Sequence, residues 1–146
     1  GKELSWLPSY GPEMRGGTAS CSVTISDESV GSPIIDNPDV LIVMNLPSLD
    51  KYEKTVKKGG VIFVDSTLIE RKVVRDDVKV FYIPSTKIAQ DMGTPNLANI
   101  VLLGKVLKEC PEIGMDGMEE ALRKVVSKRP EMYETNMKAV EAGYNY

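Results

Sequence analysis

Short apolar runs separated by polar and turn-forming residues recur along the first half of the chain, as is typical of strands. The unbroken apolar run 40–44 is too short for a helix core and predicts a strand buried on both faces. Runs 61–64 and 78–83 predict further strands, and two others are predicted at 4–7 and 19–25. Unbroken runs of this kind are typical of parallel strands that helices cover on both sides.

Helices are predicted between and after these strands. Ser48 is the expected N-cap of a helix over 49–56, and Ser85 the expected cap of a helix over 86–92. Amphipathic stripes predict three further helices, over 95–110, 118–126 and 131–142.

Together these elements predict one α/β domain over residues 1–146, with a mostly parallel sheet flanked by helices and a helical C-terminal part. Gly104 lies inside a predicted helix and is expected to mark close packing rather than chemistry.

Composition excludes several classes of function. The net charge of −3 gives no basic field for nucleic acid or an anionic membrane, and no apolar run reaches the ~20 residues of a membrane helix. We expect a cytoplasmic protein. Histidine is absent, and Cys21 and Cys110 have no CxxC partner, so the chain lacks the residues for His-based catalysis or an iron–sulfur cluster of its own.

The segment from Ser9 to Thr18, SYGPEMRGGT, carries more local constraint than any other. Its proline fixes one φ angle, and Gly16 and Gly17 allow a close approach of the backbone to another group. Arg15 presents a planar fork that suits a phosphate or a carboxylate. The alternative is a simple turn between two strands, for which glycine and proline are also common.

The motif SYGPEMRGG resembles a loop in the gamma subunits of 2-oxoacid:ferredoxin oxidoreductases, particularly the 2-oxoglutarate and branched-chain members. The likeness continues in family order through LIVMN at 41–45, PSLD at 47–50, GG at 59–60, IP at 83–84 and ANI at 98–100. The resemblance also implies a strand, a glycine-rich turn and a helix before residue 1, so the domain is expected to be N-terminally incomplete.

The resemblance implies a subunit of a complex that oxidatively decarboxylates a 2-oxoacid, with 2-oxoglutarate favoured, to an acyl-CoA and CO2 while reducing ferredoxin. Pyruvate, branched-chain or aryl 2-oxoacids are the alternative substrates. Thiamine diphosphate, Mg and iron–sulfur clusters are expected in the partner alpha, beta and ferredoxin-like delta subunits. Coenzyme A is the co-substrate, and this chain alone is expected to bind no cofactor and to have no activity.

The resemblance and the loop chemistry together predict a binding site at Tyr10, Arg15, Gly16 and Gly17. Arg15 is expected to contact a coenzyme A phosphate or a partner carboxylate, the two glycines to offer backbone N–H groups, and Tyr10 to pack against the cofactor or a partner. No catalytic or metal-binding residue is predicted.

Other polar segments also follow predicted strands, at 45–48, 65–67 and 85–86. Because ligands gather at the carboxyl ends of parallel strands, these segments and the loop at 10–17 are predicted to share one edge of the sheet. For Asn45, Asp65 and Ser85 themselves a capping or turn role is favoured.

Two other classes of function remain open: a small-molecule binding module, and an interaction domain that touches no ligand. A phosphate-binding glycine turn after the first strand, which a nucleotide-dependent module needs, is not in the sequence. Buried-type strands such as 41–44 need cover on both faces, so the isolated chain is expected to self-associate through an apolar surface.

Overall fold

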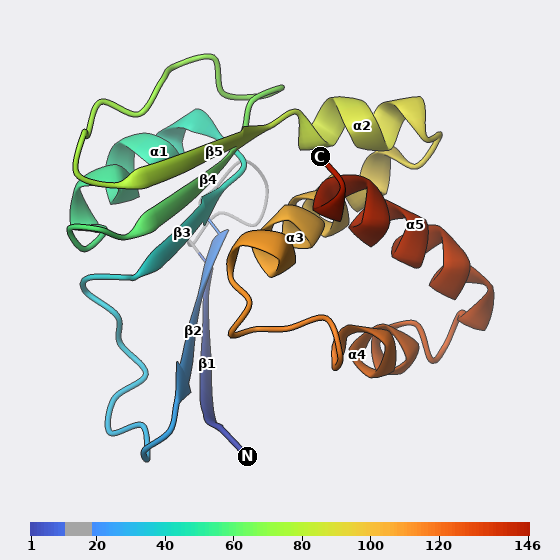
Figure 1. Cartoon of the computed structure of the whole chain (residues 1–146), viewed down its shortest axis with the longest axis horizontal. Coiled ribbons are helices and arrows are strands. Elements are labelled where there is room, and N and C mark those ends of the chain that lie inside the picture. Colours follow the sequence, from blue (N-terminus) through green and yellow to red (C-terminus); the bar gives the residue numbers. More distant parts are fainter. Residues whose placement is uncertain (11–18) are drawn as a thin grey trace.

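The protein is described from a computed structural model that covers residues 1–10 and 19–146 (Figure 1). The strands are β1 (Glu3–Tyr10), β2 (Ala19–Ser26), β3 (Val40–Val43), β4 (Val61–Asp65) and β5 (Lys79–Ile83). The helices are α1 (Leu46–Tyr52), α2 (Ser85–Asp91), α3 (Ala98–Glu109), α4 (Met118–Val125) and α5 (Tyr133–Tyr144), with 3-10 helices η1 (Glu53–Thr55), η2 (Pro95–Leu97) and η3 (Pro130–Met132). Each strand and helix predicted from the sequence is present, with its ends shifted by a few residues.

A three-stranded parallel sheet in the order β3–β4–β5 forms the centre of the fold, which confirms the predicted parallel arrangement. The central strand β4 pairs Val61 with Val40 on one side and with Lys79 on the other. The helices that follow β5 gather to one side of this sheet and form the helical C-terminal part (Figure 1).

Alternate side chains of β4 enter two different cores. Ile62 and Val64 pack with Leu49 of α1 on one face of the sheet. Phe63 points to the other face and packs with Leu102 of α3. Because all three β4 side chains are fully buried, β4 shows the two-sided burial that its apolar run predicts.

β3 is an edge strand, so the prediction that it is buried on both faces is wrong. Val40 and Ile42 are 36% and 47% exposed, whereas Val43 is buried on the α1 side. The core beneath α3 takes residues of β4 and β5 but neither of these two β3 side chains. An apolar run shows that a strand is suited to burial, not that its own chain covers it.

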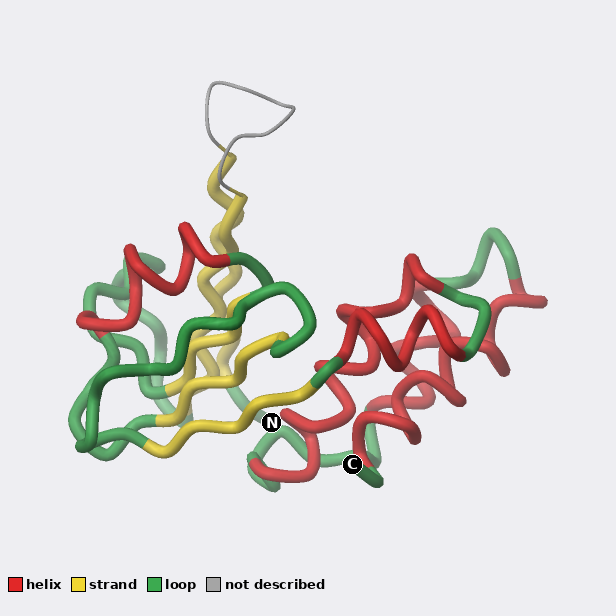
Figure 2. The backbone as a smooth tube through the Cα atoms, turned by 90° about the horizontal axis from the view of Figure 1, so that it is seen from above, coloured by secondary structure: helices red, strands yellow, loops and turns green. Residues whose placement is uncertain are grey.

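β1 and β2 form a separate antiparallel hairpin and do not join the parallel sheet. They pair in register from Glu3 with Ser26 to Tyr10 with Ala19. Figure 2 shows the hairpin running away from the three-stranded sheet. The prediction of one shared edge is therefore wrong for Tyr10, which ends a strand of another sheet. Two strands so close in sequence pair most readily as an antiparallel hairpin.

α1 begins one turn earlier than predicted. Asn45, not Ser48, is its N-cap, because the Asn45 Oδ1 accepts a hydrogen bond from the Ser48 backbone N–H at 2.9 Å. Pro47 fits the first turn, where no backbone donor is needed. The capping role favoured for Asn45 is confirmed.

Two glycines let α3 and α5 cross with their backbones in contact. A Cβ on Gly104 would collide with the Val140 carbonyl and lie 2.8 Å from the Tyr144 nitrogen. A Cβ on Gly143 would fall on the Val101 carbonyl. The close-packing role predicted for Gly104 is confirmed, while Gly143 was not singled out from the sequence.

Among the described residues, no helix combines the length and the apolar composition that crossing a membrane requires.

Candidate functional site

The carboxyl edge of the parallel sheet gathers the polar residues that follow its three strands. Asn45 follows β3, Asp65 ends β4, and Ser85 and Thr86 follow β5. Ligands of open parallel sheets bind at this edge. The hydrogen bonds of these side chains therefore decide whether they are free to contact a ligand.

Asp65 is fully buried, and internal hydrogen bonds occupy its carboxylate. Its Oδ1 accepts from the Thr67 backbone N–H at 3.0 Å, and its Oδ2 accepts from the Thr86 backbone N–H at 3.2 Å and from the Thr86 hydroxyl. The carboxylate thus ties the end of β4 to the first turn of α2, and satisfies donors that a helix start leaves free. The turn and capping role favoured for Asp65 is confirmed.

Ser85 does not cap α2, contrary to the prediction. It is the first residue of the helix, is fully buried, and its Oγ finds no hydrogen-bond partner in the described part of the chain. The Thr86 N–H that a cap would satisfy is bonded to Asp65, 21 positions earlier in the sequence. A cap from a neighbouring strand leaves no local sequence signal.

The polar groups at this edge are therefore engaged in helix starts. Asn45 caps α1, and Asp65 accepts a hydrogen bond from the Thr86 backbone N–H in the first turn of α2. In the same turn, the Thr67 Oγ1 accepts from the Lys87 backbone N–H at 3.1 Å. This edge therefore joins the sheet to its helices, and its polar side chains have a structural role.

Tyr10 is 76% exposed at the end of β1, so its ring is accessible to a ligand or a partner. Arg15, Gly16 and Gly17 lie outside the described residues. Their contacts with a phosphate or a carboxylate stay a prediction.

The hairpin approaches the rest of the chain at Tyr52 of α1. A hydrogen bond with the Ser20 hydroxyl lowers the pKa of Tyr52 below its ordinary value, and Lys51 acts in the same direction. This contact turns the serine-bearing face of β2 toward α1.

A buried ionic cluster behind α1 was missed in the sequence. Glu53, 6% exposed, accepts hydrogen bonds from Arg71 Nη2 and from the Val74 backbone N–H, both at 2.7 Å. Arg75 donates to the Glu53 carbonyl at 3.2 Å and pairs with Asp77 at 2.7 Å. These contacts hold the long β4–β5 connection against η1. A single glutamate near a helix end carries no sequence signal for such a role.

Replacing Glu53 with glutamine is expected to lower the free energy of unfolding by about 1–3 kcal/mol, because Arg71 loses its buried counter-charge. Burial alone raises the pKa of Glu53, but the hydrogen bonds and charge of Arg71 and the Val74 N–H outweigh it and hold the pKa below its ordinary value. The stabilisation is therefore present above the unfolded pKa, about 4.3, and is lost as the pH falls through the folded pKa.

Denaturant unfolding of wild type and Glu53→Gln from neutral to acid pH measures this difference, which should shrink with acidification. Glu120→Gln is the control, since its ion pair with Lys124 is exposed on α4 and its removal should change little. A gap between wild type and Glu53→Gln that is the same at all pH values would contradict the assignment.

A shallow hollow of about 350 Å³ lies at the opposite, amino edge of the sheet, and three of the charged residues that line it, Asp39, Lys57 and Glu109, form ion pairs. Lys57 pairs with Asp39 at 2.8 Å, and Glu109 with Lys105 at 2.7 Å. Burial raises the pKa of the Cys110 thiol in the same wall, which favours its unreactive protonated form. Within residues 1–10 and 19–146, no three His, Cys, Asp or Glu side chains are grouped to hold a metal ion.

Comparison with known proteins places the chain in a family. The family model for pyruvate ferredoxin/flavodoxin oxidoreductase matches residues 1–146. The ketoisovalerate oxidoreductase subunit VorA of Methanothermobacter marburgensis is 37% identical over 151 residues, covering 100% of this chain and 30% of VorA. The 2-oxoglutarate synthase subunit KorC of Methanocaldococcus jannaschii is 38% identical over 145 residues, covering 98% of this chain and 76% of KorC. The chain thus spans less than a third of the VorA relatives.

Solved structures agree with the sequence relatives. The gamma subunit of a keto/oxoacid ferredoxin oxidoreductase from Geobacter sulfurreducens superimposes with a TM-score of 0.77 at 35% identity, over 99% of this chain and 79% of that subunit. The 2-oxoglutarate:ferredoxin oxidoreductase of Magnetococcus marinus gives a TM-score of 0.87 over 99% of this chain and 26% of that one, a likeness of fold alone at 21% identity. The resemblance to gamma subunits is confirmed, and the chain belongs to the pyruvate ferredoxin/flavodoxin oxidoreductase family.

Proposed function

We propose that this chain serves as the gamma subunit, or gamma domain, of a multi-subunit 2-oxoacid:ferredoxin oxidoreductase. The observation that carries the proposal is the family match over residues 1–146, together with 35–38% identity to a gamma subunit and to KorC. The complex oxidatively decarboxylates a 2-oxoacid with coenzyme A, and yields an acyl-CoA, CO2 and reduced ferredoxin.

2-Oxoglutarate is the substrate that we propose, with pyruvate, branched-chain and aryl 2-oxoacids as alternatives. KorC and VorA are 38% and 37% identical to this chain, so these two identities by themselves do not separate 2-oxoglutarate from ketoisovalerate. The choice belongs to the partner subunits. Relative kcat/KM of the assembled complex for the two acids decides it.

The residues that the chain contains indicate which functions of the complex it can perform and which belong to its partner subunits. Thiamine diphosphate with Mg and the iron–sulfur clusters supply the carbanion and electron-transfer chemistry, and the proposal assigns them to the alpha, beta and delta partners. The two cysteines do not fit a cluster, because Cys21 is exposed on β2 while Cys110 is buried beside the sheet. The chain's own part is to bind and position, and a cytoplasmic location belongs to the same proposal.

Within this proposal the hairpin loop holds coenzyme A or a partner near the reaction centre. Arg15 contacts a phosphate or a carboxylate, Gly16 and Gly17 offer N–H groups, and Tyr10 packs on the cofactor or partner. The exposed Tyr10 ring supports this role.

The isolated chain is expected to show no 2-oxoacid-dependent reduction of ferredoxin or of a redox dye. It has no histidine and too few cysteines to bind an iron–sulfur cluster, so it has no redox centre of its own that could transfer electrons. Co-expression with the neighbouring subunits should restore coenzyme A-dependent activity. Activity of the chain alone, or full activity of a complex assembled without it, overturns the proposal.

An interaction domain that binds no ligand is the second candidate. One observation favours it: the side chains of Asn45 and Asp65 at the carboxyl edge already accept hydrogen bonds from the first turns of α1 and α2, so they are not free to bind a ligand. Calorimetric titration of coenzyme A into complexes assembled with and without this chain separates the two roles. Equal affinity in both complexes supports the interaction domain.

A further inference from the structure

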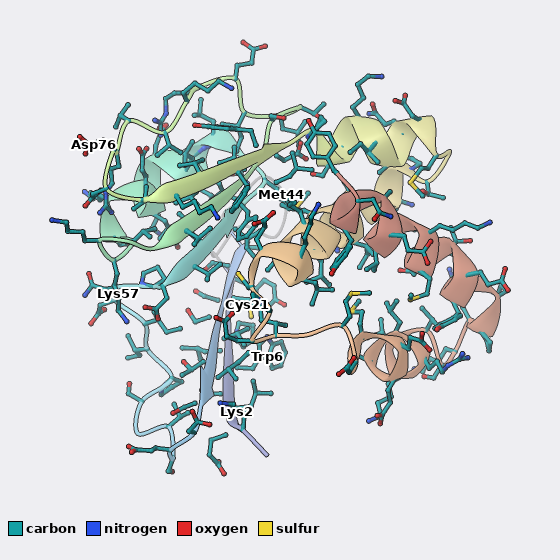
Figure 3. The ribbon with its side chains drawn as sticks, viewed as in Figure 1. Lys2, Trp6, Cys21, Met44, Lys57 and Asp76 are labelled. Atoms are coloured by element: carbon teal, nitrogen blue, oxygen red, sulfur yellow. The ribbon has the colours of Figure 1, made fainter. Side chains whose placement is uncertain are left out.

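The connection between β4 and β5 crosses from one parallel strand to the next without a helix. β4 ends at Asp65 and β5 begins at Lys79, and residues 66–78, all of which the structure describes, contain no helix or strand. Crossovers between parallel strands are usually helical, and loops longer than about 12–15 residues without regular structure are uncommon and often functional. Figure 1 shows this connection curving past α1, and Figure 3 labels Asp76 within it.

The two ends of the connection are anchored. Ile69 is 2% exposed in the core on the α1 side of the sheet, and its backbone N–H donates to the Asp65 carbonyl at 3.0 Å. At the other end the Asp77 carbonyl accepts from the Gly59 N–H at 2.7 Å, and Val78 packs against the same core. These contacts fix the points at which the connection leaves the core and returns to it.

The segment between these anchors, residues 70–76, is held in a different way, and we call it the strap. It contains no buried residue, and Val74 within it is 81% exposed. In the part of the chain that the structure describes, no backbone N–H or C=O of the strap bonds to another backbone group. Contacts with side chains therefore hold the strap in place.

Two side chains outside the strap accept its backbone donors. The Val73 N–H donates to the Tyr82 hydroxyl at 2.9 Å, and the Val74 N–H donates to the Glu53 carboxylate at 2.7 Å. The second oxygen of this carboxylate accepts from Arg71 at 2.7 Å. Glu53 is 6% exposed, so these bonds are shielded from water.

Arg75 of the strap adds contacts in the same place. Its guanidinium donates to the backbone carbonyls of Glu53 and Val56 in and after η1, and pairs with Asp77 at 2.7 Å. Three strap residues thus contact Glu53 through its carboxylate or its carbonyl. Because one residue takes part in so many of the contacts, breaking them releases the strap as a whole.

We propose that the strap is a local opening unit: residues 70–76 detach together from Glu53 and Tyr82 and reattach, while the three-stranded sheet stays folded. Segments with few buried apolar contacts open at a lower free energy than the core, and the strap has no backbone ladder to break. Opening withdraws Val73 from the α1-side core and releases the guanidinium groups of Arg71 and Arg75 from Glu53. This movement is independent of the proposed enzymatic role.

Hydrogen exchange of single amides tests the proposal with two variants. Glu53→Gln weakens the bond of the Val74 N–H, and Tyr82→Phe removes only the hydroxyl that accepts from Val73. If the strap opens as one unit, each variant speeds the exchange of both amides, including the amide whose own acceptor it leaves intact. The Ile62 amide of β4, under a core, is the reference for opening of the whole fold.

In wild type, Val73 and Val74 should exchange at least about 10-fold faster than Ile62. Low urea should change their rates little and accelerate Ile62 steeply, because strap opening exposes little surface. Both strap amides should accelerate about 5-fold in Tyr82→Phe and about 10-fold or more in Glu53→Gln, where the lost bonds involve a charge.

Glu120→Gln is the control, because it removes an exposed ion pair on α4 and should leave both strap amides unchanged. Strap amides that exchange as slowly as Ile62, with the same dependence on urea, overturn the proposal, since the strap then opens only with the whole fold. A variant that accelerates only the amide whose acceptor it changes also overturns it. Tyr82→Phe keeps the aromatic ring, so it provides the test even if Glu53→Gln does not fold.

Discussion

Gly143→Ala is expected to lower the free energy of unfolding by about 3 kcal/mol or more, at the upper end of overpacking costs. The new methyl group would fall on the Val101 carbonyl, and this atom belongs to a helix backbone that has no rotamer to change. The clash is relieved when α5 moves away from α3, and that movement opens the contacts that Ala139 and Val140 make in two cores. Gly104→Ala should act in the same way on the other helix.

Chemical denaturation monitored by circular dichroism measures the loss. Gly31→Ala is the matched control, because nothing lies within 4 Å of the added methyl group there, and it should leave the midpoint nearly unchanged. An unchanged midpoint for Gly143→Ala would mean that the two helix backbones do not meet at this residue.

Arg15→Ala is expected to cost about 2–5 kcal/mol at the ligand site or interface of the assembled complex, because the proposed role of Arg15 is a bidentate contact whose loss leaves the anion unpaired. Arg15→Lys should recover part of this loss, since an ammonium cannot reproduce the planar fork. The stability of the isolated fold should stay close to wild type.

The measurement combines subunit assembly, the KM for coenzyme A and thermal stability on one preparation of each variant. A raised KM with intact assembly assigns Arg15 to coenzyme A, and lost assembly assigns it to a partner. If all three quantities match wild type, the loop is a simple turn and its assignment as a site fails.

The sequence predicts those parts of the fold that local patterns determine. Apolar runs located the strands of the parallel sheet, and apolar stripes located α3, α4 and α5, because period and length distinguish the two kinds of element. The family resemblance rests on short motifs spread through the chain, and the match over residues 1–146 confirms it.

Contacts between residues that are far apart in the sequence could not be predicted from these local patterns. The start of α2 is bonded to the carboxylate of Asp65, which lies 21 positions before Thr86 in the sequence. The local sequence offered Ser85 instead, because it is the polar residue next to the predicted helix. β3 carries the apolar run of a central strand yet lies at an edge, because coverage depends on which elements come to lie beside it. The alternation in β2 likewise does not show which of its two faces lies toward α1, and the contact between Ser20 and Tyr52 settles this only in the structure.

Because the strands belong to two separate sheets, their backbone amides are expected to exchange hydrogen with solvent by different opening reactions. The amides of β4 are bonded within a ladder between two strands and under two cores, so hydrogen exchange there requires global unfolding. The ladder of β1 and β2 belongs to a separate sheet, and it can open locally at a lower free energy while the parallel sheet stays intact. Whatever binds the hairpin raises the protection of these amides by mass action. Their exchange rates thus report occupancy of the hairpin, while those of β4 report the fold itself.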